Sequence, residues 1–188
     1  MHMGTEYYSQ TELLNFGFKH VGKNVKIKKN VGIYFTENVS LGDNVRIDDN
    51  VIIVASGEPV EIGSYVHIAS NCCLAASAGL EMSDFSGLAP GVMIFTGSDD
   101  YSGGKLTNPT VAREYIGGKT GKVSLGRHVI VGAGSVVFPK VVIGEGAAVG
   151  AMSLVNKSLE PWNVYFGIPV KRLKSRSKNL LNLDKKFL

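Results

Sequence analysis

Aliphatic residues recur at every sixth position along most of this 188-residue chain. An α-helix repeats every 3.6 residues, so it cannot place one apolar residue in six on a single face. A simple meander of strands would alternate apolar and polar residues between regularly spaced turns, which also fits poorly. The eighteen positions are Val21, Ile27, Ile33, Leu41, Ile47, Ile53, Ile62, Ile68, Leu74, Met82, Leu88, Ile94, Leu125, Val131, Val137, Ile143, Val149 and Val155.

The hexads predict a three-sided coil, in which each hexad is one short strand followed by a tight corner. Three hexads complete a turn of about 18 residues, so that the aliphatic side chains of successive coils stack inside a prism. Backbone hydrogen bonds then run between coils, as they do in a parallel sheet. Glycine often follows the aliphatic residue, as at Gly22 and Gly132, and it accounts for 23 residues of the chain. Small residues near the corners let the backbone bend.

Three short slips and one long interruption break the rhythm of the hexads. The slips at 34–40, 54–61 and 80–81 are interpreted as corner bulges. A solenoid tolerates such bulges because each coil contacts only its neighbours. The polar segment 97–122 is much longer. We expect it to leave the prism as an arm that closes a pocket.

Segments at both ends of the prism are expected to cover its exposed ladders. Residues 1–20 form the predicted N-terminal cap, residues 21–160 the coiled body, and residues 161–188 a closing turn and helix. At the N-terminus, Ser9 or Thr11 is a suitable cap for a short lid helix. The apolar side of this helix would consist of Leu13, Leu14 and Phe16.

The last eighteen residues are basic and contain several leucines. We interpret them as a capping helix with a solvated basic face, and a helix that lies on a membrane surface is the alternative. No apolar run approaches the roughly 20 residues of a membrane span, so we expect no membrane insertion. The leucines of this helix would be Leu173, Leu180, Leu181 and Leu183.

Charge and cysteine content exclude other classes of partner. The net charge of +4 is mild, and much of it lies toward the two ends of the chain, so we expect no nucleic-acid partner. Cys72 and Cys73 are adjacent, too close for a relaxed disulfide, and no second pair of cysteines exists, which favours a reducing compartment such as the cytoplasm. The cysteines and histidines lack the spacing of a zinc site, so we expect no metal.

The hexads, together with the ending "SLVNKSLEPW…GIPVKRLK", resemble the hexapeptide-repeat acyltransferases. The similarity is to the galactoside, maltose and O-antigen sugar acetyltransferase group, and it covers residues 20–175. It implies an all-β fold, the left-handed parallel β-helix. It also implies a homotrimer, because flat-sided prisms can pack against copies of themselves and leave binding slots between them.

The resemblance further implies a cytoplasmic acetyltransferase that uses acetyl-CoA. Its acceptor would be a hydroxyl or amino group of a sugar, with nucleotide-linked sugars included, in surface polysaccharide or O-antigen (lipopolysaccharide) synthesis. Two alternatives share the fold: acylation of a non-sugar acceptor such as a drug or an amino acid, and a non-catalytic hexapeptide-repeat binding protein. The cofactor-like ending of the chain argues against the second alternative.

In this group, acetyl-CoA lies along a slot between prisms, where small corner residues let its thin pantetheine chain approach the backbone. Carried over residue by residue, the resemblance implies five positions that contact acetyl-CoA. Two of them are lysines, which suit the phosphates of CoA as point charges. The five positions are Ala133, Ala151, Asn156, Lys157 and Lys174.

Members of this group usually carry a histidine at the start of the arm as general base, and an ungapped match places Asp99 there. Three explanations stay open. In the first, Asp99 or Asp100 holds an ammonium group and accepts its proton, which favours an amino-sugar acceptor. In the second, His67 in "YVHIASN" is the base. In the third, the arm only binds sugar and the protein is a poor or inactive catalyst.

The acceptor would also contact residues near the arm and near His67. Phe95 and Tyr101, at the root of the arm, would stack on the sugar ring, and Asn71 lies one short strand from His67. Each candidate also has a structural interpretation: His67 as an outward strand residue in the trimer contact, and the two aspartates as a turn. His128 in "GRHV" is interpreted as an exposed, structural corner residue.

Overall fold

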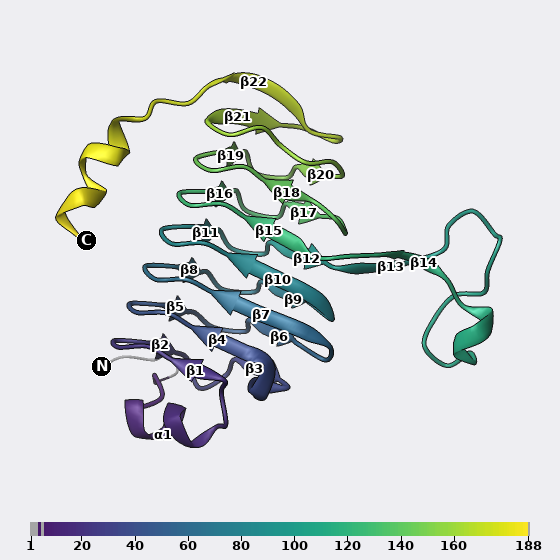
Figure 1. Ribbon diagram of the computed structural model, residues 1–188, viewed down its shortest axis with the longest axis horizontal. Helices are drawn as coiled ribbons and strands as arrows, with labels where there is room; N and C mark the ends of the chain where they lie inside the picture. The colour runs from purple at the N-terminus through teal and green to yellow at the C-terminus, as the bar shows by residue number, and fades with distance from the viewer. Residues whose placement is uncertain (1–3, 5, 188) are drawn as a thin grey trace.

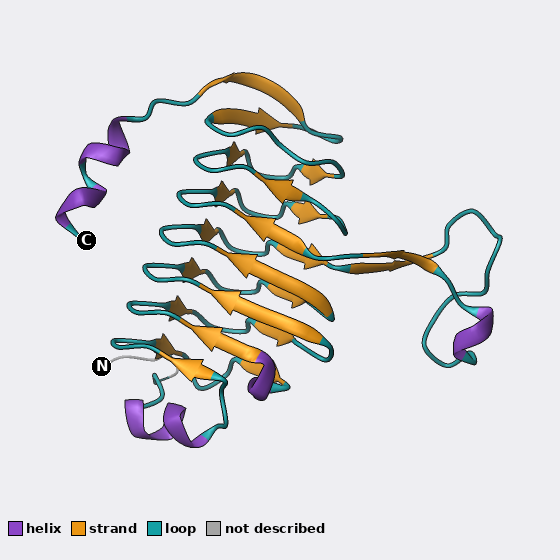
Figure 2. Ribbon diagram, viewed as in Figure 1, coloured by secondary structure: helices purple, strands orange, loops and turns teal. Residues whose placement is uncertain are grey.

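The computed structural model describes residues 4 and 6–187, which form a three-sided prism of stacked coils (Figure 1). Strands make up the prism, and short helical turns occur at its ends and at the tip of the arm (Figure 2). Each face of the prism is a sheet whose strands come from successive coils and pair in parallel, except for the last strand of one face, which pairs antiparallel. The expected all-β solenoid is therefore confirmed, and it is consistent with the left-handed β-helix that the resemblance implies.

In the first two faces, the order of the strands follows the chain from the N-terminal to the C-terminal end of the prism. Face 1 consists of β1 (His20–Val21), β4 (Val39–Leu41), β7 (Glu58–Ile62), β10 (Ala78–Met82), β15 (Val123–Leu125) and β18 (Val142–Ile143). Face 2 consists of β2 (Lys26–Ile27), β5 (Arg46–Ile47), β8 (His67–Ile68), β11 (Gly87–Leu88), β16 (Ile130–Val131), β19 (Ala148–Val149), β21 (Asn163–Phe166) and β22 (Lys171–Ser175).

The third face closes the prism. Face 3 consists of β3 (Gly32–Tyr34), β6 (Ile52–Val54), β9 (Cys73–Ala75), β12 (Met93–Phe95), β17 (Val136–Val137) and β20 (Leu154–Val155). The slip at 34–40 contains a 3₁₀ turn, η1 (Thr36–Asn38).

The predicted aliphatic ladders form the core. Leu41 lies opposite Ile62, and Ile62 lies opposite Met82. Met82 lies opposite Leu125, which follows the segment 97–122 in the sequence. Sixteen of the eighteen predicted positions are buried, and the other two are half-buried and pack against the core. Burial of one such side chain contributes about 1.5–3 kcal/mol. Burial of these ladders therefore contributes much of the free energy that stabilises the coiled fold.

The corner between faces 2 and 3 carries an asparagine ladder. Asn50 and Asn71 have left-handed backbones with φ of 58° and 64°. Asparagine tolerates this conformation better than most side chains do. Asn30 Nδ2 donates to Asn50 Oδ1 at 2.9 Å, and Asn50 Nδ2 donates to Asn71 Oδ1 at 3.3 Å. Asn71 therefore has a structural role at this corner.

The segment 97–122 leaves the prism as an arm, as expected. Its base is an antiparallel pair, β13 (Gly97–Asp99) and β14 (Gly118–Thr120), and its tip contains a 3₁₀ turn, η2 (Arg113–Tyr115). At its root, the buried Thr96 hydroxyl accepts from Ala78 N at 2.9 Å and donates to Ala75 O at 3.0 Å. The arm points away from the C-terminal segment, on the opposite side of the prism (Figure 1).

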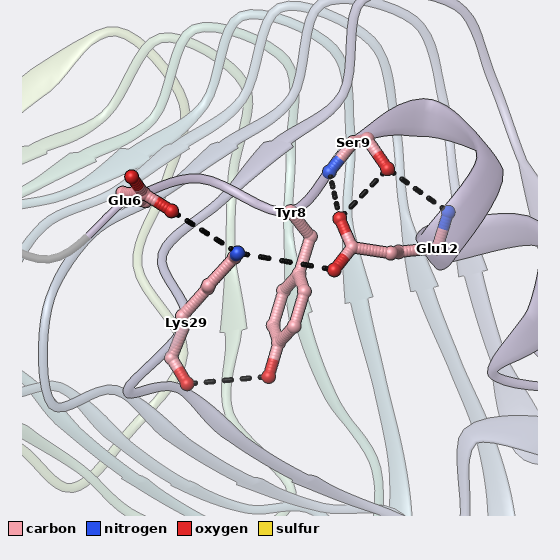
Figure 3. A network of polar contacts seen from close by, with 5 residues as sticks. All are labelled: Glu6, Tyr8, Ser9, Glu12 and Lys29. Carbon is pink, nitrogen blue, oxygen red and sulfur yellow. Dashed lines mark hydrogen bonds and ion pairs between the residues drawn. The ribbon is translucent and has the colours of Figure 1, made fainter.

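The N-terminal lid helix is α1 (Gln10–Asn15), and Ser9 rather than Thr11 is its cap. Ser9 and Glu12 form a capping box: Glu12 N donates to Ser9 Oγ at 3.2 Å, and Ser9 N donates to Glu12 Oε2 at 2.7 Å (Figure 3). Of the three predicted apolar residues only Leu13 is buried, whereas Leu14 is 64% exposed. Leu13 joins the core, and the Phe16 ring at the end of the helix packs edge-on against Tyr8 with ring centroids 4.9 Å apart.

The predicted C-terminal helix is wrong over its first part. Residues 171–175 form strand β22, which pairs antiparallel with β21. The edge of β21 offers unpaired backbone groups, and the chain satisfies them by folding back on itself. Leu173 consequently lies on an exposed strand. Helical turns begin only at η3 (Asn179–Asn182) and η4 (Asp184–Lys186), and among the described residues no helix is long and apolar enough to cross a membrane.

Candidate functional site

A groove of about 630 Å³ runs between face 2 and the C-terminal segment. Its floor comes from β8, β11 and β16, where His67, Gly87 and Ile130 lie in register on successive coils. Gly87 has no side chain, so the floor is hollowed between its two neighbours. Leu183 and Phe187 of the C-terminal segment line the opposite wall.

The C-terminal segment is attached to the prism by charged groups. Arg176 Nη1 donates to the carbonyl oxygens of His128 and Gly146 at 2.8 and 3.0 Å. Asp184 Oδ2 accepts from Arg127 Nη2 at 2.9 Å and pairs with His128 Nε2 at 2.8 Å. His128 was expected to be exposed, but it is buried because the C-terminal segment covers it. Its contacts agree with a structural role.

Aromatic side chains form a column at the corner between faces 1 and 2. Tyr65 stacks on Phe85 with ring centroids 4.7 Å apart, and Phe85 stacks on His128 at 5.2 Å. Phe187 packs edge-on against Tyr65 at 5.9 Å. The sequence analysis missed this column, although its three members occupy one hexad position on successive coils. Asn44 holds the same position one coil earlier.

His67 is the only predicted catalytic residue that lines the groove. Its side chain is 51% exposed, and its Nε2 lies 2.7 Å from Asp48 Oδ2. Arg46 Nε donates to the other oxygen of Asp48 at 2.7 Å. Asp48 itself is buried. Burial is the largest influence on the pKa of the Asp48 carboxyl and raises it, but the bonds from His67 and Arg46 outweigh burial and hold this pKa below its ordinary value.

The sequence analysis did not single out Asp48 or Arg46. The length of one coil, about 18 residues, could have identified them. His67 lies 19 residues after Asp48, so the two residues stand on neighbouring coils. In face 2, Arg46 pairs with His67 and His67 pairs with Gly87, so a guanidinium group, an imidazole ring and a position without a side chain follow one another on three successive coils.

The predicted arm residues lie elsewhere. Asp100 uses both of its carboxylate oxygens within the arm, because Oδ1 accepts from Ser102 and Oδ2 accepts from Lys105 N. These bonds, above all that from the Ser102 side chain, lower the pKa of Asp100. Asp99 is exposed and has one long bond, from Asn108 N at 3.4 Å. Of the two aspartates, only Asp99 therefore has a carboxylate oxygen free of contacts in the described part of the chain.

The other predicted contact residues are spread over the prism. Tyr101 is 93% exposed on the arm, whereas Phe95 is half-buried at its root on face 3. Ala133 and Ala151 lie on successive coils at the corner between faces 2 and 3, where Met152 N donates to Ala133 O at 2.8 Å. The remaining three positions, all exposed, are Asn156 and Lys157 after β20, and Lys174 on β22.

Within residues 4 and 6–187, no group of three or more His, Cys, Asp or Glu side chains is placed to hold a metal ion. In the groove, His67 is the predicted catalytic residue; behind it, Asp48 is its carboxylate partner and Arg46 holds that carboxylate. On the arm, the available group is the carboxylate of the exposed Asp99. Strand β8, which carries His67, and the arm with β13 and β14 lie on opposite sides of the prism, so one chain does not bring His67 and the arm together (Figure 1).

No protein-family model matches the chain. Among curated proteins, the dTDP-4-amino-4,6-dideoxy-D-glucose acyltransferase of Escherichia coli is 40% identical over 181 residues, which are 96% of this chain and 94% of that protein. A chloramphenicol acetyltransferase of Klebsiella aerogenes is also 40% identical, but only over 58 residues, 31% of this chain and 28% of that protein. Similarity to the drug acetyltransferase thus covers less than a third of either chain.

Among solved structures, AntD, an N-acyltransferase from Bacillus cereus, is similar over almost its whole length. Its complex with dTDP and 3-hydroxybutyryl-CoA has a TM-score of 0.92 and 47% identity, and covers 97% of this chain and 96% of that one. A variant of AntD in complex with dTDP-4-amino-4,6-dideoxyglucose and coenzyme A has a TM-score of 0.93, with coverage of 99% and 98%. These similarities therefore include the arm and the terminal segments as well as the hexads.

Proposed function

Because the chain belongs to the hexapeptide-repeat sugar acyltransferases, we propose that it transfers an acyl group from a CoA thioester to the amino group of a nucleotide-linked 4-amino-4,6-dideoxy sugar. The observation that carries the proposal is the 40% identity to the Escherichia coli acyltransferase across 96% of the chain. The AntD complex with the same type of amino sugar supports amide rather than ester formation. We place the reaction in the cytoplasm, as a step in surface polysaccharide synthesis.

The donor is proposed to lie along the corner that contains Ala133 and Ala151. These alanines sit on successive coils and add little bulk beyond the backbone, so a thin pantetheine chain can approach closely. Lys157 and Lys174 are exposed and have no ion-pair partner in the described part of the chain, which leaves them available to the phosphates of CoA, with Asn156 beside them. Acetyl-CoA is the predicted donor, and 3-hydroxybutyryl-CoA is the competitor suggested by AntD.

The active unit is proposed to be a homotrimer. Asp99 belongs to β13 of the arm, which points away from the prism, and His67 belongs to β8 on the other side. A site that uses both residues therefore needs two chains, with the arm of one chain closing the groove of the next. Tyr101, almost fully exposed, would then lie against the sugar ring of a neighbouring site.

In the proposed reaction, the acceptor arrives as an ammonium ion that Asp99 holds by charge. His67 Nδ1 takes one proton, and the free amine attacks the thioester carbonyl carbon to form a C–N bond. The tetrahedral intermediate collapses, the C–S bond breaks, and the CoA sulfur leaves with the electron pair. The nitrogen loses its second proton as the amide forms. One proton ends on the CoA thiol and the other passes from His67 to solvent.

The test is thiol release from acetyl-CoA and 3-hydroxybutyryl-CoA with a panel of acceptors. We expect turnover with dTDP-4-amino-4,6-dideoxyglucose and little with the sugar that carries a hydroxyl in place of the amine. Chloramphenicol and serine test the non-sugar alternatives. A preference for any of these three, or no thiol release with any acceptor, would overturn the proposal.

Variants of the arm test the role of Asp99. We expect Asp99→Asn to lower kcat/KM by about 10²-fold, because an amide carries no negative charge to hold the ammonium. Glu114→Gln is the matched control, since Glu114 is an exposed carboxylate on the same arm. Equal activity of both variants would remove Asp99 from the site.

A further inference from the structure

We infer that Asp48 is a positioning residue that fixes the orientation and tautomer of His67, so that Nδ1 is the nitrogen presented to the acceptor. The inference rests on the proposed function and deepens it, because it explains how a histidine on a flat strand serves as a base.

The contact between the two side chains is short and specific. His67 Nε2 lies 2.7 Å from Asp48 Oδ2, and the 8% exposure of Asp48 keeps water from competing for this oxygen. A carboxylate only accepts hydrogen bonds, so Nε2 carries a proton and Nδ1 of the neutral ring is left as the basic nitrogen. In the described residues, Nδ1 has no hydrogen-bond partner, and the ring is half-exposed on the groove.

Arg46 holds the carboxylate in turn. Its Nε donates to Asp48 Oδ1 at 2.7 Å, so the two oxygens of Asp48 have separate partners and the carboxylate cannot rotate without losing one of them. Both partners stand on face 2, on the strands β5 and β8 that pair directly. A rigid sheet therefore sets the direction of the imidazole ring, as the third member of a nucleophile–base–orienter set does.

Charged groups lie near His67 on the coil below it and on the C-terminal segment. The coil below contributes Arg46 and Asp48, and the coil above contributes Gly87, which has no charge. Arg176 and Asp184 of the C-terminal segment line the same groove, but their own partners on the prism hold them. Asp48 is therefore the one carboxylate that contacts His67 among the described residues.

The experiment compares pH–rate profiles of the wild type and Asp48→Asn. Asparagine keeps the size of the side chain but removes its negative charge, so the protonated imidazole loses stabilisation. The acid limb of kcat/KM is therefore expected to move to lower pH, and the maximal rate to fall about tenfold or more, a part of the roughly 10²–10⁴ that a general base supplies. Lys26→Gln is the control and should retain the wild-type profile, because the exposed Lys26 pairs in register with Arg46 but has no contact with Asp48 in the described part of the chain.

A double variant separates positioning from a merely structural role. If Asp48 acts through His67, adding Asp48→Asn to His67→Ala should lower the rate no further. Additive losses, or an acid limb that does not move in Asp48→Asn while the wild type turns over, would overturn the inference and leave the proposed function standing. Absence of turnover in the wild type would overturn both. The ring protons of His67, followed by NMR titration, give a readout that does not depend on activity.

Discussion

Ser86 occupies the small fifth place of its hexad, and its hydroxyl oxygen is buried with no hydrogen-bond partner in the described part of the chain. Gly87 pairs with His67 and Ile130 on the coils below and above, so the preceding residue, Ser86, lies between Val66 and Val129. Both valines are buried. A buried hydroxyl without a partner costs about 1–3 kcal/mol. Ser86→Ala removes this cost and leaves a void of about one oxygen atom, which offsets part of the gain.

We therefore expect Ser86→Ala to stabilise the fold by about 1 kcal/mol, which is roughly 2–4 °C in Tm for a chain of this size. Ser135→Ala is the matched control, since Ser135 occupies the same place of a later hexad and is equally buried. The Ser135 hydroxyl donates to Gly150 O at 3.0 Å and accepts from Ser153 N at 3.2 Å. Its removal leaves the Ser153 amide unpaired and should cost about 1–2 kcal/mol.

Thermal unfolding followed by circular dichroism compares the two variants with the wild type. Protein concentration is held fixed, because assembly of chains would make Tm depend on concentration. The reasoning requires shifts of opposite sign for Ser86→Ala and Ser135→Ala. A lower Tm for both would show that the Ser86 hydroxyl has a partner, such as an enclosed water, and would refute the argument.

Two further predictions concern the cap and the arm. The hydrogen bonds from Ser9, its side chain first, lower the pKa of the exposed Glu12 carboxyl, so their stabilisation of α1 is present above the unfolded pKa and lost as pH falls through the folded one. The protection factors of the α1 amides, which are exchange rates normalised to the intrinsic rate at each pH, should therefore fall on acidification in the wild type and depend less on pH in Ser9→Ala. Thr96→Val removes the hydroxyl that links Ala78 N to Ala75 O at the root of the arm, so KM for the acceptor should rise severalfold while CoA affinity, measured by calorimetry, stays unchanged.

The body of the prism was predictable because one physical signal recurs in every coil. Each inward position must be aliphatic, and its partners in the coils above and below obey the same rule, so the ladders follow from the sequence. The arm was predictable for the converse reason: hexads stop after Ile94 and resume at Leu125. A chain that cannot fill the core has to leave it.

The C-terminal segment was less predictable, because its conformation depends on a neighbour rather than on its own pattern. The leucines of this segment permit a helix, yet residues 171–175 meet the open edge of β21 and pair with it. The pairing of Asp48 with His67 was hidden for a related reason. Coils vary in length, as the pairs Leu41–Ile62 and Ile62–Met82 show, so neighbours across coils become visible only when the register is known.

The aromatic column explains why the C-terminal segment lies where it does. Tyr65, Phe85 and His128 have φ of 58°, 57° and 61°, a conformation that costs non-glycine residues about 1–3 kcal/mol. Asparagine would relieve part of this strain, as at Asn44 one coil earlier. The aromatic rings offset it by stacking on one another, and they present an apolar surface that Phe187 covers. The aromatic residues at these strained corners thus hold the C-terminal segment in place through Phe187. Because that segment forms the outer wall of the groove, the three corner residues also determine the shape of the groove.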